Sequence, residues 1–143
     1  MDWIVNVIND AENKTDLCFI SYNSRGFGQM KTNFCKYLLS EYFVGDKLPI
    51  LCNQENFVLR GNSYKINKNF PGFHLIINPA VKESHCKGRA KNGMFIAIPD
   101  RLKNKTEDVS PGHWRLQAIK IKTETDEMLN PTFQLIREIT KLM

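Results

Sequence analysis

Two short polar clusters hold the residue types best suited to chemistry in this sequence. One lies at residues 22–24 and the other at residues 54–56, each at the end of an apolar run. They contribute Asn23 and Glu55, whose amide and carboxylate oxygens are hard ligands of the kind that Mg²⁺ takes in proteins. Such an ion can polarise a phosphoryl oxygen and activate water. Asn23 and Glu55 are therefore candidate catalytic and metal-binding residues, although a lone Glu in a loop is more often a solvated charge.

The segments around these clusters predict how the chain positions them. The apolar runs at residues 17–22 and 48–53 are typical of buried strands. Residues 29–43 between them have the three- and four-residue spacing of one helical face, with apolar positions at Met30, Phe34, Tyr37, Leu38 and Tyr42. In a strand–helix–strand unit the two strands are parallel, so both clusters reach the same end of the sheet, where ligand sites collect. We expect the polar atoms of Asn23 and Glu55 to lie within roughly 8 Å of each other.

The rest of the chain predicts an α/β fold with a mixed sheet. Residues 64–66, 74–77 and 94–98 are short strand candidates, and residues 114–122 alternate as a half-buried strand does. Residues 133–143 have helical spacing. Residues 3–8 fit either an edge strand or a terminal extension. We divide the chain into an N-terminal extension (1–15), a main domain (16–129) and a C-terminal helix of the same domain (130–143).

Composition limits the function classes. The chain has 143 residues, a hydrophobic content of 42% and a net charge of +5, which fits one globular domain and weakly favours a polyanionic partner. Its four cysteines show no C-x-x-C pair, so we expect reduced thiols. No apolar stretch reaches the roughly 20 residues of a membrane span, and an acid near the start argues against a secretion signal. We expect a nuclear or cytoplasmic protein with no membrane partner.

Four motifs in order resemble the endonuclease/exonuclease/phosphatase superfamily, which includes the exonuclease III and AP-endonuclease-like enzymes. Residues 20–26 (ISYNSRG) resemble its first strand motif, and residues 50–55 (ILCNQE) resemble its second. Residues 86–98 resemble its G-R-x-x-G-G-x-x-I stretch, and residues 113–118 the strand that follows. Within the superfamily, the sequence most resembles endonuclease domains of invertebrate non-LTR retrotransposons. The resemblance implies a four-layer α/β sandwich and a divalent metal, Mg²⁺ or Mn²⁺, held partly by Asn23 and Glu55. At Asn56 the family more often has Thr or His.

The resemblance also shows what this sequence lacks. The family continues with a catalytic Tyr, a Gly-Asp-x-Asn motif and a Ser-Asp-His motif, and none of them follows the strand that ends near Lys122. The pattern suggests an internal loss near Leu129 and truncation after Met143. We therefore expect the front half of the domain, with a metal held weakly if at all. The inner face of its sheet should be exposed, which would favour self-association.

The resemblance and the charge pattern imply DNA as the partner. A basic, glycine-flanked loop contributes His85, Lys87, Arg89 and Lys91, and the first motif contributes Arg25. These residues are candidate nucleic-acid contacts, because Lys and Arg gain free energy by releasing counterions from phosphates. A solvated loop is an equally good interpretation of His85. The main hypothesis is a fragment of a Mg²⁺-dependent phosphodiesterase acting on DNA that is inactive alone. The alternatives are a non-catalytic nucleic-acid-binding fragment and a degenerate product without selected function.

Overall fold

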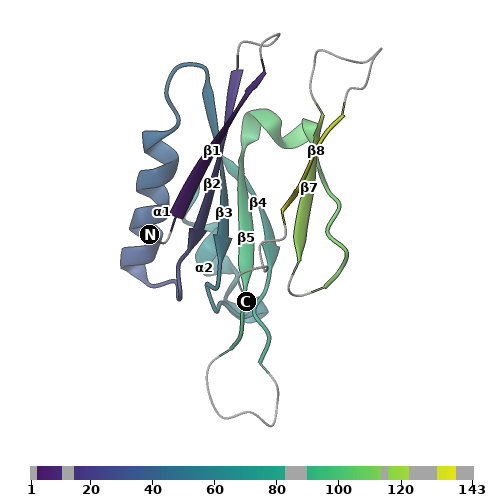
Figure 1. Cartoon of the computed structure of the whole chain (residues 1–143). Coiled ribbons are helices and arrows are strands. Elements are labelled where there is room, and N and C mark those ends of the chain that lie inside the picture. The colour runs from purple at the N-terminus through teal and green to yellow at the C-terminus, as the bar shows by residue number, and fades with distance from the viewer. Residues whose placement is uncertain (1–2, 11–14, 83–89, 114–115, 123–131, 138–143) are drawn as a thin grey trace.

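Two β-sheets and one long helix make up most of the chain that the structure describes (Figure 1). The computed structural model describes residues 3–10, 15–82, 90–113, 116–122 and 132–137. The larger sheet has five strands in the order β1-β2-β3-β5-β4. Their bounds are β1 (Trp3–Asp10), β2 (Thr15–Asn23), β3 (Lys47–Gln54), β4 (Phe73–Asn78) and β5 (Met94–Pro99). Only β2 and β3 are parallel, whereas the other neighbours are antiparallel. The prediction of an α/β fold with a mixed sheet is confirmed.

The helix α1 (Gln29–Glu41) connects β2 to β3 and covers one face of the larger sheet. Its buried residues are Thr32, Cys35, Leu38 and Leu39. The predicted helix is confirmed, but its predicted core face is partly wrong, because Met30 is 81% exposed and Tyr37 is 55% exposed. The face that contacts the sheet is formed by Thr32, Cys35, Leu38 and Leu39, so it is offset around the helix from Met30 and Tyr37.

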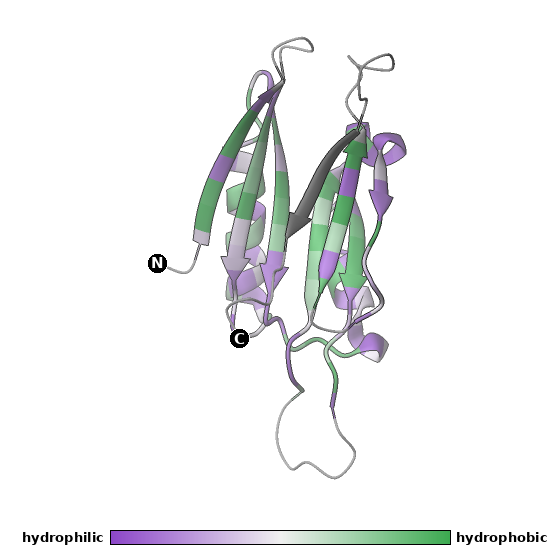
Figure 2. Cartoon of the chain, turned by 45° about the vertical axis from the view of Figure 1, so that its right-hand side comes forward, coloured by the Kyte–Doolittle hydropathy of each residue, from purple (hydrophilic) through white to green (hydrophobic). Residues whose placement is uncertain are grey.

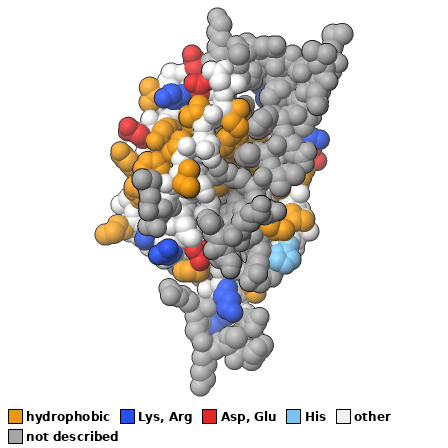
Figure 3. All heavy atoms as spheres, viewed as in Figure 1, with side chains coloured by type: hydrophobic (Ala, Val, Ile, Leu, Met, Phe, Trp, Pro, Cys, Tyr) orange, Lys and Arg blue, Asp and Glu red, His pale blue; other side chains and the backbone are white. Residues whose placement is uncertain are grey.

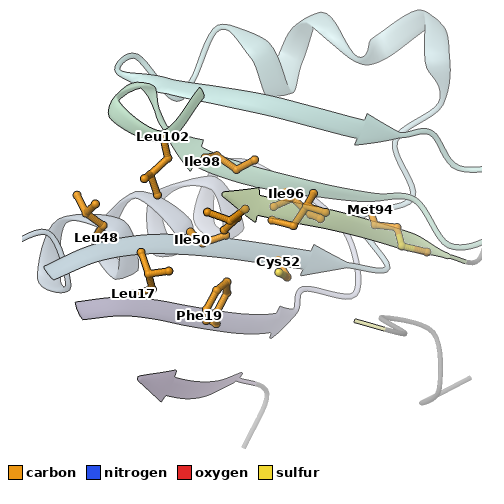
Figure 4. Packing of buried hydrophobic residues seen from close by; sticks show 11 residues of the cluster. Leu17, Phe19, Leu48, Ile50, Cys52, Met94, Ile96, Ile98 and Leu102 are labelled. Carbon is orange, nitrogen blue, oxygen red and sulfur yellow. The ribbon is translucent and has the colours of Figure 1, made fainter. Parts of the chain in front are cut away.

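A second sheet covers the opposite face. It has three strands in the order β6-β7-β8, namely β6 (Thr106–Asp108), β7 (Gln117–Lys122) and β8 (Thr132–Arg137). Ile119 and Ile121 of β7 join the core cluster formed by side chains of β2, β3 and β5, which gather on one face of the larger sheet (Figure 4). Phe19, Ile50 and Ile96 are at most 1% exposed. The expected exposed inner face is therefore wrong at these positions, because the second sheet covers it.

Two further elements differ from the prediction, and one open alternative is decided. Residues 64–66 lie in the short helix α2 (Tyr64–Asn67) rather than in a strand, with Ile66 buried and Tyr64 exposed. The chain over Thr132–Arg137 is strand β8, not the start of a C-terminal helix, because it pairs antiparallel with β7. Of the two alternatives for residues 3–8, the structure has the edge strand: β1 pairs with β2 along its whole length from Trp3 to Asp10.

The remaining helices are short. They are the 3₁₀ helices η1 (Arg60–Asn62) and η2 (Asp100–Lys105). Within the described ranges, no helix has the length and apolar character needed to cross a membrane.

Candidate metal site at the end of the parallel strands

The parallel pair β2–β3 ends in polar side chains at one edge of the larger sheet. Tyr22 pairs with Asn53 and Asn23 pairs with Gln54 in the register of the two strands. Figure 2 shows the same change, with hydrophobic strands becoming hydrophilic toward their lower ends. The last residues of both strands therefore meet, as the strand–helix–strand pattern predicts.

Asn23 and Glu55 are in direct contact at this edge. The Nδ2 amide of Asn23 donates a hydrogen bond to Oε2 of Glu55. The predicted juxtaposition of these two side chains is confirmed. A carboxylate only accepts hydrogen bonds, so the amide must present its nitrogen to Glu55. As a result, Oδ1 of Asn23 is buried and has no hydrogen-bond partner.

Next to this contact, buried side-chain amides and the hydroxyl of Ser24 form a hydrogen-bond network. Nδ2 of Asn53 donates to Oγ of Ser24 at 2.9 Å, and that hydroxyl donates to the Gln54 carbonyl at 3.2 Å. Nδ2 of Asn56 donates to Oδ1 of Asn53 at 3.1 Å. Ser24 and Asn53 are fully buried, and Asn56 is 2% exposed. Buried polar groups cost free energy unless they are paired, so this network favours one arrangement of the strand ends.

A third segment fixes the backbone of residues 55–57. The amide of Asn56 donates to the carbonyl of Gly93 at 3.1 Å, and the amide of Phe57 donates to the carbonyl of Asn92 at 2.8 Å. Gly93 has φ +85°, and a Cβ added to it would lie 2.3 Å from Oδ1 of Asn56. Only glycine fits at this position, because any side chain would push the second polar cluster away.

Left-handed backbone conformations gather around the same point. Within the described ranges, the non-glycine residues with positive φ are Arg25 (48°), Glu55 (52°), Phe57 (60°) and Asn92 (63°). The segment after Arg25 is also joined to Glu55 through the backbone, since the amide of Gly26 donates to the carbonyl of Glu55 at 2.8 Å. Each such residue costs on the order of 1 kcal/mol, and strain of this kind accumulates at functional sites.

Two of the candidate nucleic-acid contacts are exposed residues in the segments that hold Asn23 and Glu55. Arg25 is exposed two positions after Asn23, and Lys91 is exposed next to Asn92, whose carbonyl accepts a hydrogen bond from the amide of Phe57. The other three, His85, Lys87 and Arg89, lie outside the described residues.

The three cysteines within the described ranges do not supply a nucleophile at this site. Cys18, Cys35 and Cys52 are buried free thiols, which agrees with the expected reduced state, whereas Cys86 lies outside the described residues. Burial raises the pKa of the Cys35 thiol to about 12. Its thiolate, the reactive form, is therefore scarce at neutral pH.

Asn23 and Glu55 together offer two hard oxygen donors. Oδ1 of Asn23 is a buried oxygen without a partner, and Glu55 adds a carboxylate next to it. Among the residues that the structure describes, no cluster of three or more His, Cys, Asp and Glu side chains could hold a metal. Two oxygen ligands suit Mg²⁺, which usually takes one or two carboxylates and keeps several waters. They would not suit a zinc site, which needs three or four protein ligands.

The sequence did not predict the residues that hold Asn23 and Glu55 in place, namely Ser24, Asn53, Asn56 and Gly93. The signal was present in the run Asn53-Gln54-Glu55-Asn56, where polar residues continue a strand that is otherwise buried. Four consecutive polar residues at a buried strand end must satisfy one another, as Asn53 and Asn56 do. The contribution of Ser24 and Gly93 depends on tertiary contacts that the spacing alone does not show.

Comparison with known proteins adds no relative: no family model, no curated protein and no solved structure matches this chain.

Proposed function

We propose that Asn23 and Glu55 are the cation-binding part of a Mg²⁺-dependent phosphodiesterase site of the endonuclease/exonuclease/phosphatase type. The observation that carries the proposal is their direct contact at the end of two parallel strands, with Oδ1 of Asn23 buried and unpartnered. The two packed sheets, with α1 on the outer face of one of them, agree with part of a four-layer α/β sandwich.

Each residue of the site has a stated task in this proposal. Glu55 provides the anionic ligand and Asn23 a neutral amide oxygen, while Asn53 and Ser24 hold the strand ends in register. A bound Mg²⁺ would supply positive charge that polarises a phosphoryl oxygen. The protein's own contribution is to hold the side chains of Asn23 and Glu55 together before the ion arrives, which lowers the cost of ordering them. Binding of the ion by both residues would require the Asn23 amide to turn so that Oδ1 replaces Nδ2 next to Glu55.

DNA is the proposed substrate class. Arg25 and Lys91 are exposed beside the site, where phosphates of a bound strand would pass. Contacts of this kind position a nucleic acid without reading its sequence. The substrate assignment therefore rests on charge next to the metal ligands and on the family motifs.

We further propose that this chain does not cleave DNA by itself. Its sequence contains neither a Gly-Asp-x-Asn motif nor a Ser-Asp-His motif. In the family these motifs supply the base and the groups that stabilise the phosphate, and each general acid–base role is typically worth 10²- to 10⁴-fold in rate. The loss of several together leaves a rate near background.

Plasmid nicking tests this part of the proposal. The chain and its Glu55→Ala variant are incubated with supercoiled plasmid in Mg²⁺ and in Mn²⁺, and we expect equal background nicking from both. Nicking by the parent chain that disappears in the variant would show a complete active site and overturn the proposal of inactivity.

A second candidate function is nucleic-acid binding without catalysis. The observation that favours it is the exposure of Arg25 and Lys91 in two segments that adjoin the end of β2 and β3. We expect Arg25→Ala and Lys91→Ala each to weaken DNA binding and to reduce its dependence on salt.

Lys47→Ala, at the opposite end of β3, is the matched control and should change neither quantity. DNA binding that responds equally to all three substitutions would reject a defined contact surface. Neither DNA nor cation binding would favour a degenerate product.

A further inference from the structure

The first strand of the larger sheet offers an open edge. β1 (Trp3–Asp10) is the terminal strand in the order β1-β2-β3-β5-β4, and within the described ranges no strand pairs with its outer side. Its outward amide and carbonyl groups can therefore pair with another strand. The opposite edge is partly covered, because Nε2 of Gln117 donates to the carbonyl of Ile76 in β4 at 2.9 Å. The two edges thus differ, and β1 is the accessible one.

β1 lacks the features that usually protect an edge strand. Such strands are commonly short, interrupted by a bulge or Pro, or marked with Lys. Residues 3–9 contain no charged residue and no Pro. The pairing with β2 is continuous from Trp3 opposite Tyr22 to Asp10 opposite Thr15. Ile4 is 60% exposed and Val7 is 56% exposed, one on each face of the strand. An unprotected apolar edge of this kind is a binding surface for another strand.

The sequence of β1 specifies which strand fits. Residues 4–8 read Ile-Val-Asn-Val-Ile, which is the same in both directions. If two copies pair antiparallel about a two-fold axis at Asn6, Asn6 faces Asn6 of the other copy. Val5 then faces Val7, and Ile4 faces Ile8. From residue 4 to residue 8 every cross-strand pair joins identical residue types, and no charged residues meet there. Farther out, Trp3 faces Asn9, and Asp10 faces Asp2 of the other copy.

We propose that β1 pairs with β1 of a second copy in this register, joining the two larger sheets into one continuous sheet. Apolar surface continues beside the strand, where the ring of Trp3 lies 6.4 Å from that of Phe34 and Phe34 stacks on the exposed Tyr37. Figure 3 shows hydrophobic side chains on the part of the surface that β1 crosses. Strand pairing alone buries less than a standard interface of about 1,600 Å², so the dimer is concentration-dependent. This proposal is independent of the metal site.

Charge placed on the two-fold axis tests the register. Asn6 is exposed, so Asn6→Lys and Asn6→Glu leave the fold intact, but each puts like charges opposite each other in the dimer. By analytical ultracentrifugation at about 100 µM, we expect dimers of the parent chain and monomers of each variant. A mixture of the two variants should recover dimers, because Lys then faces Glu. Asn62→Lys, an exposed position in η1, is the control and should remain dimeric. A monomeric parent chain, dimers that persist in both variants, or no recovery in the mixture would overturn the proposal.

Cross-linking gives a second measurement in a Cys86→Ser background. Residues opposite each other in antiparallel strands have Cα atoms about 4.5–5.5 Å apart, which a disulfide spans. Oxidised Asn6→Cys should therefore form a covalent dimer. Val7→Cys should cross-link at least tenfold more slowly, because the two copies of residue 7 lie about 8 Å apart along the paired strands. Equal cross-linking at both positions would exclude this register.

Discussion

The two ends of the parallel pair β2–β3 are built differently, although both carry acidic residues. At one end, Asp16 and Asp46 lie near a solvent-exposed turn, and the amide of Asp16 donates to the carbonyl of Asp46 at 2.8 Å. At the other end, Glu55 contacts Asn23 above a buried network of amides and hydroxyls.

The backbone shows the same contrast. The turn before β3 places Gly45 at φ +62°, so the left-handed residue is one that adopts this conformation readily. The Glu55 end places Arg25, Glu55 and Phe57 there instead. A carboxylate by itself therefore does not mark a site. The combination of a buried, unpartnered oxygen and a strained backbone distinguishes the Glu55 end, and both features cost stability that a binding function would explain.

The largest expected difference between the two ends concerns their glycines. Gly93→Ala adds a Cβ 2.3 Å from Oδ1 of Asn56 at φ +85°, whereas Gly45→Ala adds a Cβ with nothing within 4 Å. We expect Gly93→Ala to lower the free energy of unfolding by about 3 kcal/mol, through steric clash and backbone strain, and Gly45→Ala by about 1 kcal/mol through strain alone. Urea denaturation measures both. Equal losses would mean that the packing around Gly93 yields easily and does not hold the site.

A smaller effect is expected from the buried amide of Asn53. Asn53→Ala removes the donor to the Ser24 hydroxyl, which keeps its bond to the Gln54 carbonyl, and removes the acceptor of the Asn56 amide. We expect a loss of about 1–3 kcal/mol in the free energy of unfolding. Asp46→Ala, at the exposed end, should stay within about 0.5 kcal/mol of the parent chain. An Asn53→Ala variant as stable as the parent would show that the polar network contributes nothing to the fold.

The smallest effect should have opposite signs at the two ends. Arg25 is an exposed residue at φ 48°, so Arg25→Gly relieves strain, and we expect a gain of about 0.5–1 kcal/mol. Lys47→Gly in extended strand β3 should instead lose about 0.5–1 kcal/mol, because Gly weakens a strand. Thermal denaturation of both variants compares the signs. A destabilised Arg25→Gly variant would contradict strain at that residue.

The sequence predicted the elements with strong local patterns. The runs that became β2 and β3 and the intervening helix were long and periodic, and they were enough to bring Asn23 next to Glu55. The chain over 132–137 was predicted as a helix because its local spacing is helical, yet it pairs with β7, so a tertiary contact outweighed local preference. Residues 64–66 were too few for either period to be decisive.

The sequence could not decide whether residues 3–8 form an edge strand, again because the answer depends on a tertiary contact. Whether β1 was a strand depended on an available partner, and the sequence does not show that β2 has a free side there. The site was predictable as far as its two ligands, because they follow apolar runs directly. Gly93 and Ser24 could not be assigned, because their contacts join segments far apart in the chain.

Paramagnetic broadening by Mn²⁺ tests the central claim, that a divalent cation binds at the Asn23–Glu55 end of the parallel strands. Mn²⁺ is added in small amounts to the ¹⁵N-labelled chain, and backbone amide signals are followed at both ends of β2 and β3. We expect the signals of Ser24, Gly26 and Asn56 to broaden first, while those of Asp16 and Lys47 persist. Glu55→Gln should abolish the broadening, because Glu55 is the carboxylate in contact with the Asn23 side chain, whose Oδ1 has no partner. Asp46→Asn, at the other end of the strands, should leave the broadening unchanged. Broadening at the Asp46 end, or equal broadening in the Glu55→Gln variant, would contradict the claim.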